Sequence, residues 1–97
     1  MFEMNKPKYL TRGVNAEIPI ELQLFMWNCI DSIPKKKDYL QVFKLSNENG
    51  MQRIEHSHEQ PNFKMNYVLT TIDNPVTEKI YVIDDGEHLT MLLAKEY

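Results

Sequence analysis

The residues best suited to bind a metal ion are two histidines, His56 and His58, separated by Ser57. Alternate residues of a β-strand project from the same face, so both imidazoles can contact one ion if this segment is a strand. His88 is a third candidate ligand if its hairpin lies beside that strand. A zinc site needs three or four ligands in tetrahedral geometry, and only two lie close together in the sequence. We therefore expect no metal and no other cofactor, and keep a metal- or ligand-binding site at His56, His58 and His88 as the alternative.

A second group with potential chemistry is the acidic segment Asp84-Asp85-Gly86-Glu87. Calcium needs six or more oxygen ligands from a shaped loop, and this segment is too short to supply them. Carboxylates that work in acid–base catalysis need a pocket that raises one pKa, and the sequence gives no sign of a pocket. Asp-Gly is typical of a turn, because glycine adopts positive φ and aspartate tolerates it. We interpret the segment as a structural turn.

Two further groups carry weaker signals. Arg12-Gly13 precedes a predicted helix, whose start can bind an anion, but Arg12 can equally pair with Glu17 or Glu21. Cys29 falls near the apolar side of that helix with no neighbouring base, so we expect a buried thiol. The serines lie in no nucleophile motif. The sequence thus predicts no catalytic residue, and we expect a protein that is not an enzyme.

The element that dominates the pattern is a helix expected over Pro19–Ile33, with Pro19 at its first position and Pro34 ending it. At about 100° per residue its residues divide into two faces. The apolar face comprises Leu22, Met26, Trp27, Ile30 and Ile33, and Trp27 is expected to anchor the core. The polar face comprises Glu21, Asn28, Asp31 and Ser32. Leu24 and Phe25 fall beside the polar face, which predicts apolar surface available to a partner.

The remaining pattern is that of short strands. One is expected at Lys8–Arg12, ended by Gly13 and Asn15, and another at Phe63–Thr70. Glu78–Ala94 is expected to form a hairpin around a two-residue Asp-Gly loop. In that register Val82 pairs with Leu89 and Ile80 with Met91. Its reverse face carries apolar residues as well, namely Tyr81, Ile83 and Leu92.

A first hairpin is expected from Asp38–Ser46 and Met51–His58, joined by a turn at Asn47–Gly50. Placing Ser46 opposite Met51 sets the provisional register, which a glycine bulge at the turn would shift by one residue. The pairs expected from it are Phe43 with Ile54, Gln41 with His56 and Tyr39 with His58.

Together these elements predict an α+β fold, in which one amphipathic helix packs on a curved, mainly antiparallel sheet of five to six strands. The 97 residues suffice for one globular domain, expected at residues 8–97, with residues 1–7 as a flexible tail. One helix covers only one face of such a sheet. The apolar reverse face of the second hairpin is then either wrapped into the core by curvature or available to a partner.

Composition narrows the function classes. A hydrophobic content of 42% with 26% charged residues is typical of a globular protein and not of a disordered one. The net charge of −3 makes nucleic acid an unlikely partner, and the run Lys35-Lys36-Lys37 is best explained as solvated charge after a helix. No apolar run approaches the ~20 residues of a membrane span. A single cysteine excludes an internal disulfide and favours a cytoplasmic protein.

Four segments also carry a family resemblance: Tyr9–Asn15, Glu17–Trp27, Asp38–Phe43 and Ile83–Leu93. In this order and spacing they resemble the domain-of-unknown-function family number 960, first described as staphylococcal proteins of unknown function. The resemblance covers the chain from about residue 8 to Tyr97. It implies an intracellular protein of Gram-positive bacteria or their mobile elements. The family has no established activity, so the resemblance implies no functional residue.

We therefore expect a small non-enzymatic interaction or accessory protein. Its interaction surface is expected at Leu24 and Phe25 of the helix, or at Tyr81, Ile83 and Leu92 of the second hairpin. The partner is expected to be another protein or a second copy of this chain. A small metal- or ligand-binding regulator that uses His56 and His58 is the alternative.

Overall fold

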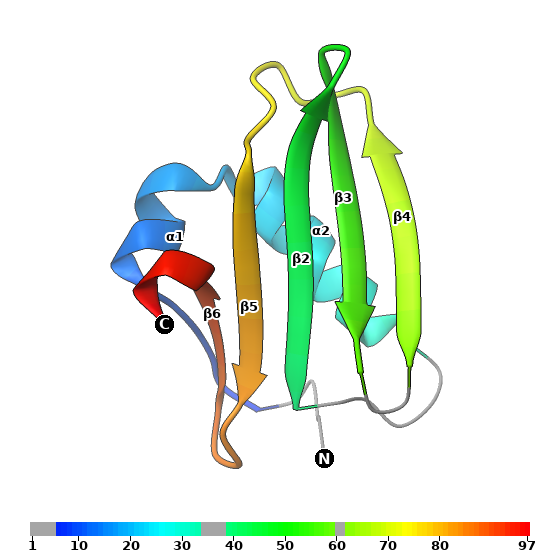
Figure 1. Cartoon of the computed structure of the whole chain (residues 1–97). Helices are drawn as coiled ribbons and strands as arrows, with labels where there is room; N and C mark the ends of the chain where they lie inside the picture. Colours follow the sequence, from blue (N-terminus) through cyan, green and yellow to red (C-terminus); the bar gives the residue numbers. More distant parts are fainter. Residues whose placement is uncertain (1–5, 34–38, 60–61) are drawn as a thin grey trace.

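The computed structural model describes residues 6–33, 39–59 and 62–97, and forms one six-stranded sheet with helices on one side (Figure 1). Along the chain the elements are β1 (Lys8–Leu10), α1 (Arg12–Glu17), α2 (Ile20–Asp31), β2 (Leu40–Glu48), β3 (Met51–His58), β4 (Phe63–Leu69), β5 (Glu78–Asp84), β6 (Leu89–Leu93) and the 3-10 turn η1 (Ala94–Glu96). The strand order is β1-β6-β5-β2-β3-β4. β1 runs parallel to β6 and the other neighbours are antiparallel. The predicted α+β class with up to six strands is confirmed, whereas the parallel pair and a second helix were not predicted.

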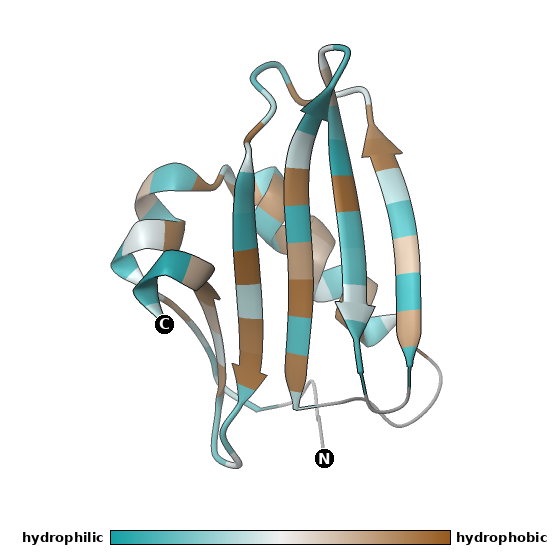
Figure 2. Ribbon diagram, viewed as in Figure 1, coloured by the Kyte–Doolittle hydropathy of each residue, from teal (hydrophilic) through white to brown (hydrophobic). Residues whose placement is uncertain are grey.

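The two faces of the sheet differ in what covers them. Alternate strand residues join the helices in one hydrophobic core, among them Phe43, Ile54 and Ile80, which the pairing places in adjacent strands on the same side. We call this side the core face and the other side the open face. α2 lies behind the core face in Figure 1, and no described helix lies across the open face. Figure 2 shows brown, apolar residues along β5 and β2.

α2 begins after Pro19, as expected, and runs from Ile20 to Asp31. Leu22, Met26 and Ile30 are fully buried in the core cluster. The polar Gln23 is buried too, and its side-chain amide donates to the Ile18 carbonyl over 2.8 Å. Trp27 is only partly buried at the border of the core, with the Lys8 ammonium 5.9 Å from its ring centroid. The expectation that Trp27 anchors the core is therefore wrong, because the fully buried side chains of this helix are those of Leu22, Met26 and Ile30.

Gly13 and Asn15 were expected only to end the strand predicted at Lys8–Arg12, but both residues lie within the helix α1. Thr11 caps this helix, since its hydroxyl oxygen accepts from the Val14 N–H over 3.3 Å. Gly13 leaves room for the Glu96 side chain, because a Cβ built at residue 13 would lie 2.6 Å from Oε2 of Glu96 and that carboxylate would have to move. The residue thus marks a close approach of two chain segments and not a helix stop.

The β2–β3 hairpin has a tighter turn than expected. Glu48 pairs with Met51, so the loop is Asn49-Gly50 alone, with φ of +54° and +84°. These left-handed conformations are typical of a two-residue hairpin loop with Asn-Gly. The register is therefore shifted by two residues from the predicted one. His56 now lies opposite Phe43, and Ile54 opposite Leu45.

The β5–β6 hairpin is also shifted by two residues. Asp84 pairs with Leu89, and Val82 with Met91 in place of Leu89. The loop is longer than predicted because its backbone donates to two carboxylates. Asp84 accepts from the Gly86 N–H over 2.9 Å, and Asp85 accepts from the N–H groups of Glu87 and His88. A shift of two leaves every side chain on its predicted face, since the period of a strand is two.

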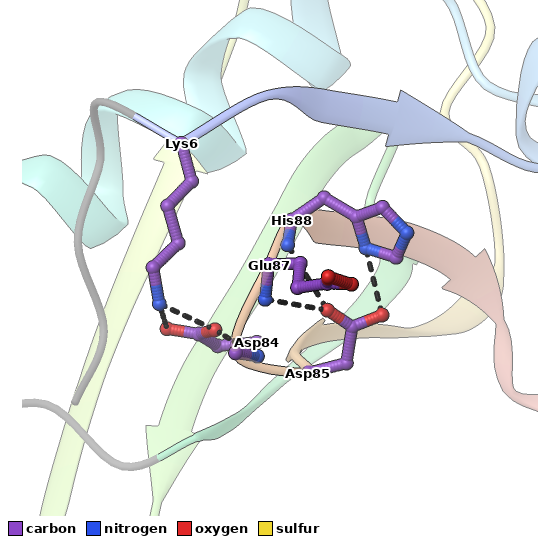
Figure 3. Close-up of polar contacts among 6 residues, drawn as sticks. Lys6, Asp84, Asp85, Glu87 and His88 are labelled. Carbon is purple, nitrogen blue, oxygen red and sulfur yellow. Dashed lines mark hydrogen bonds and ion pairs between the residues drawn. The ribbon is translucent and has the colours of Figure 1, made fainter.

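The segment predicted to be a tail contacts the sheet where it is described. The Lys6 ammonium lies 2.8 Å from each carboxylate oxygen of Asp84, and the Leu89 N–H donates to the Pro7 carbonyl over 2.9 Å (Figure 3). The rest of the predicted tail, residues 1–5, and the lysine run 35–37 with Pro34 lie outside the described residues. In the described part of the chain no helix has the length and apolar character needed to cross a bilayer.

Candidate interaction surface

The three histidines proposed as metal ligands do not come together. His56 and His58 lie on the core face of β3, whereas His88 lies in the β5–β6 loop, and β2 and β5 separate β3 from β6. His88 pairs instead with Asp85, with 2.7 Å between Nδ1 and Oδ2 (Figure 3). Among residues 6–33, 39–59 and 62–97, no three His, Cys, Asp or Glu side chains are grouped so that they can hold a metal ion. The metal hypothesis therefore lacks its third ligand.

His56 is instead a buried core side chain. Its ring stacks on Phe43 with centroids 4.3 Å apart and meets Phe63 edge-on at 5.1 Å. Its Nε2 lies 2.7 Å from the Gln41 amide oxygen, so we assign the ring proton to Nε2. Burial, and to a smaller extent the neighbouring His58, lowers the pKa of His56 to about 4. The ring is neutral at physiological pH and serves the packing of β2 against β3 and β4.

The segment Arg12-Gly13, considered as an anion site ahead of the predicted helix, lies at the start of α1, where the chain supplies its own carboxylate. The Glu96 carboxylate accepts from the Thr11 hydroxyl over 2.6 Å, from the Gly13 N–H over 3.1 Å and from the Leu93 N–H over 2.8 Å. These hydrogen bonds, the one from Thr11 foremost, lower the pKa of Glu96. An external anion is therefore not needed at this helix start, and Arg12 takes no part in the contacts.

The remaining chemical candidates also have structural roles. Burial of Asp84 favours its neutral form, but the hydrogen bonds from Lys6 and Gly86 and the charge on Lys6 outweigh this effect, so its pKa is lowered. Burial raises the pKa of Cys29 to about 11, and a hydrogen bond with Tyr67 opposes the rise only in part. The thiol is therefore protonated at neutral pH and is a poor nucleophile.

The open face carries an apolar strip across three strands. Leu40 pairs with Ile83, and Val42 with Tyr81, between β2 and β5. Tyr81 in turn pairs with Leu92 of β6. We call these five residues the apolar strip. Four are partly exposed, while Leu92 is 8% exposed and lies beside Tyr81 in the β5–β6 pairing. The predicted residues Tyr81, Ile83 and Leu92 thus lie together, and sequence reasoning missed Leu40 and Val42 because the β2–β5 pairing is not local.

The two predicted helix residues lie elsewhere. Leu24 projects from α2 and is 56% exposed. Phe25 is partly buried against the core, with its ring edge-on to Tyr67 at 5.2 Å. α2, which carries Leu24, packs on the core face (Figure 1), whereas the apolar strip belongs to the open face. A single partner surface cannot include both.

A pocket adjoins the apolar strip at the ends of β2, β3 and β4. Its volume is about 230 Å³, and Leu40 and Val42 line it together with Ser57 and Lys64, all on the open face. Lys64 and two more exposed lysines, Lys44 and Lys79, border the strip. An apolar centre with a pocket and a charged border is the usual anatomy of a protein interface.

The fold and this surface define a class before any comparison: a small α+β protein whose mixed sheet is packed by helices on one face only. The family model described as "Staphylococcal protein of unknown function (DUF960)" matches residues 7–96, so the chain belongs to that family. The resemblance seen in the sequence is thereby confirmed. A comparison with curated proteins finds no match.

A solved structure has the same fold. It is described as "Crystal structure of the protein of unknown function from Enterococcus faecalis", and its chain is 28% identical to this one. The match covers 100% of this chain and 98% of the other, with a TM-score of 0.81. Neither the family nor this structure supplies an activity, so the function rests on the geometry of this chain.

Proposed function

We propose that this chain is a non-enzymatic, cytoplasmic interaction module that binds a partner protein through the open face of its sheet. The observation that carries the proposal is the apolar strip: five apolar side chains on three adjacent strands, four of them partly exposed, on the face of the sheet opposite α2. Contiguous apolar surface on a soluble protein is typical of an interaction site. The neighbouring pocket offers room for an anchoring side chain of the partner.

The chemistry of the described side chains supports a role without catalysis. The carboxylates Asp84 and Glu96 and the imidazole of His56 are engaged in structural contacts. Cys29 is buried and protonated. Ser57, His58 and Glu59 also line the pocket beside the strip, and in this proposal they shape the binding surface. Binding is then the activity that this surface supports best.

The proposal is tested by affinity capture from the cells that produce this protein, comparing the wild type with Ile83→Glu and Leu24→Glu. Both variants exchange a large aliphatic side chain for a carboxylate, one on the open face and one on α2. We expect the specific partner to be retained by the wild type and by Leu24→Glu and lost by Ile83→Glu. Thermal unfolding of each variant checks that the fold persists. Identical capture by all three proteins, or loss in Leu24→Glu alone, would show that the open face is not the docking surface.

A further inference from the structure

The open face holds an unfavourable arrangement of charge. Lys44 of β2 and Lys79 of β5 are directly paired across the two strands, on the same side as the apolar strip, and both are exposed. Like charges placed directly opposite one another destabilise a sheet. In the described part of the chain neither ammonium makes an ion pair, and Lys79 has only the Tyr81 ring, 5.5 Å away.

The charge of this face has the opposite sign to that of the whole chain. Its cations are Lys44, Arg53, Lys64 and Lys79, and its anions are Glu48, Glu55 and, at the pocket, Glu59. Arg53 is already occupied, since it lies 3.3 Å from the Glu48 carboxylate and donates to Asn66. Lys44 also lies opposite Glu55 of β3, and Glu59 lines the pocket together with Lys64. Of the three lysines, Lys79 therefore carries the charge that the described cross-strand pairs leave unmatched. The chain as a whole carries −3.

From this arrangement, and resting on the proposed function, we propose that the partner supplies an acidic peptide segment that also bears apolar side chains. Its apolar residues lie on the apolar strip, with one in the pocket beside Lys64. Its carboxylates lie over Lys44 and Lys79 and relieve their mutual repulsion. Complementary charge at a rim sets which partner is accepted and speeds association.

A second copy of this chain fits the open face less well. Two identical faces that meet about a twofold axis bring the same set of charges, with more cations than anions, to the interface from both sides. Like charges brought together at an interface cost several kcal/mol. The excess of positive charge that favours an acidic segment therefore disfavours self-association through this face.

Nucleic acid also fits less well. Base recognition on a sheet needs exposed aromatic faces for stacking. The strip is mostly aliphatic, and its one aromatic ring, Tyr81, has Tyr97 edge-on at 5.5 Å and the Lys79 ammonium over its face. A peptide with aliphatic and acidic side chains satisfies both parts of the surface.

The test selects peptides from a random displayed library against the wild type, Lys79→Glu and, as a matched control, Arg12→Glu. Lys79→Glu places opposite charges across from each other at Lys44 and thereby protects the fold. Arg12 is exposed on α1, outside the open face. We expect wild-type peptides rich in Asp, Glu and large apolar residues. Their affinity falls about tenfold in Lys79→Glu, stays unchanged in Arg12→Glu and weakens with salt.

Backbone amide shifts locate the peptide, and we expect them on β2 and β5. Selected peptides that bind there without an acidic excess overturn this inference but leave the proposed function standing. Failure to select any peptide, or selected peptides whose binding survives Ile83→Glu, overturns the inference. Oligothymidylate binding that Lys79→Glu abolishes identifies a nucleic-acid surface instead. A dimer in light scattering that Ile83→Glu dissociates identifies a second copy as the occupant.

Discussion

Acidification to pH 5 is expected to weaken this fold through one side chain, the buried His56. The ring is fully buried, stacked on Phe43, and has Gln41 as its hydrogen-bond acceptor. Its Nδ1 has no hydrogen-bond partner among the described residues. Protonation would place a charge at that nitrogen inside the core, which is why the pKa is lowered from 6.5 to about 4.

The magnitude follows from linkage. The unfolded chain binds a proton at His56 near pH 6.5, while the folded chain does so only near pH 4. Between these values the unfolded state holds more protons, so stability falls as the pH falls. From pH 7 to pH 5 the loss at this one site is about 2 kcal/mol. This is a large share of the ~5–15 kcal/mol that a domain of this kind has in total.

Urea unfolding at pH 7 and pH 5 measures the effect, with His56→Gln as the variant and His88→Gln as the control. The pH window avoids Asp84, whose lowered pKa keeps its stabilising contacts intact until the pH falls below 3.8. We expect His56→Gln to be less stable at pH 7 but to lose about 2 kcal/mol less on acidification. His88 lies in the β5–β6 loop and pairs with Asp85 outside the core, so its replacement is the control for loss of an imidazole that does not pack on Phe43. If His56→Gln keeps the full loss, or if its proton resonance titrates near pH 6.5 in the folded wild type, the reasoning is wrong.

Three further changes test the fold. Gly13→Ala is expected to lower the urea midpoint, because the new Cβ displaces the Glu96 carboxylate from its three hydrogen bonds; an equal midpoint would show that Glu96 contributes nothing. Gly50→Ala meets no atom within 4 Å but must adopt φ near +84°, so unfolding experiments should show a loss of about 1 kcal/mol, and no loss would contradict the left-handed turn. Asp84→Asn removes the charge that pairs with Lys6 at 2.8 Å, and we expect a loss of about 1–2 kcal/mol at pH 7 that shrinks in strong acid; a constant difference would contradict the ion pair.

Much of the fold was predictable because strand and helix periods are local. The buried positions Leu22, Met26 and Ile30 were identified from the spacing of apolar residues, and β3 has the predicted bounds Met51–His58. The exact pairing was not predictable, because backbone N–H groups that donate to the Asp84 and Asp85 carboxylates set the length of one loop. Since both registers shifted by two residues, the predicted faces survived.

The sequence did not predict α1, because the contact made at its glycine comes from a residue near the other end of the chain. Glycine has a low helix propensity, so Gly13 argues against a helix in the sequence. The space that this glycine leaves for Glu96 is evident only in the folded structure. Thr11, a good capping residue, was the one local signal for this helix. The parallel pairing of β1 with β6 joins residues about 80 positions apart, and no local pattern encodes such a pairing.

The sequence predicted only part of the candidate site. Alternation placed Tyr81 and Ile83 on one face, but only the pairing of β5 with β2 shows that Leu40 and Val42 extend the strip. The same pairing was needed to see Lys44 beside Lys79. Surface sites assembled from several strands depend on tertiary neighbours, so sequence reasoning finds their parts and not their extent.

The two faces of the sheet differ in how their polar and charged side chains are arranged, and this difference is the physical reason to place function on the open face. On the core face, Gln52 accepts from the Val76 N–H over 2.6 Å and donates to its carbonyl over 3.0 Å, while Nδ1 of the buried His56 has no hydrogen-bond partner among the described residues. On the open face, two lysines are opposed although a single Glu at residue 79 would convert the repulsion into an ion pair. A fold that tolerates such a conflict on an exposed face is expected to use that place for binding. An acidic partner segment removes the conflict, so stability lost in the free protein reappears as affinity in the complex.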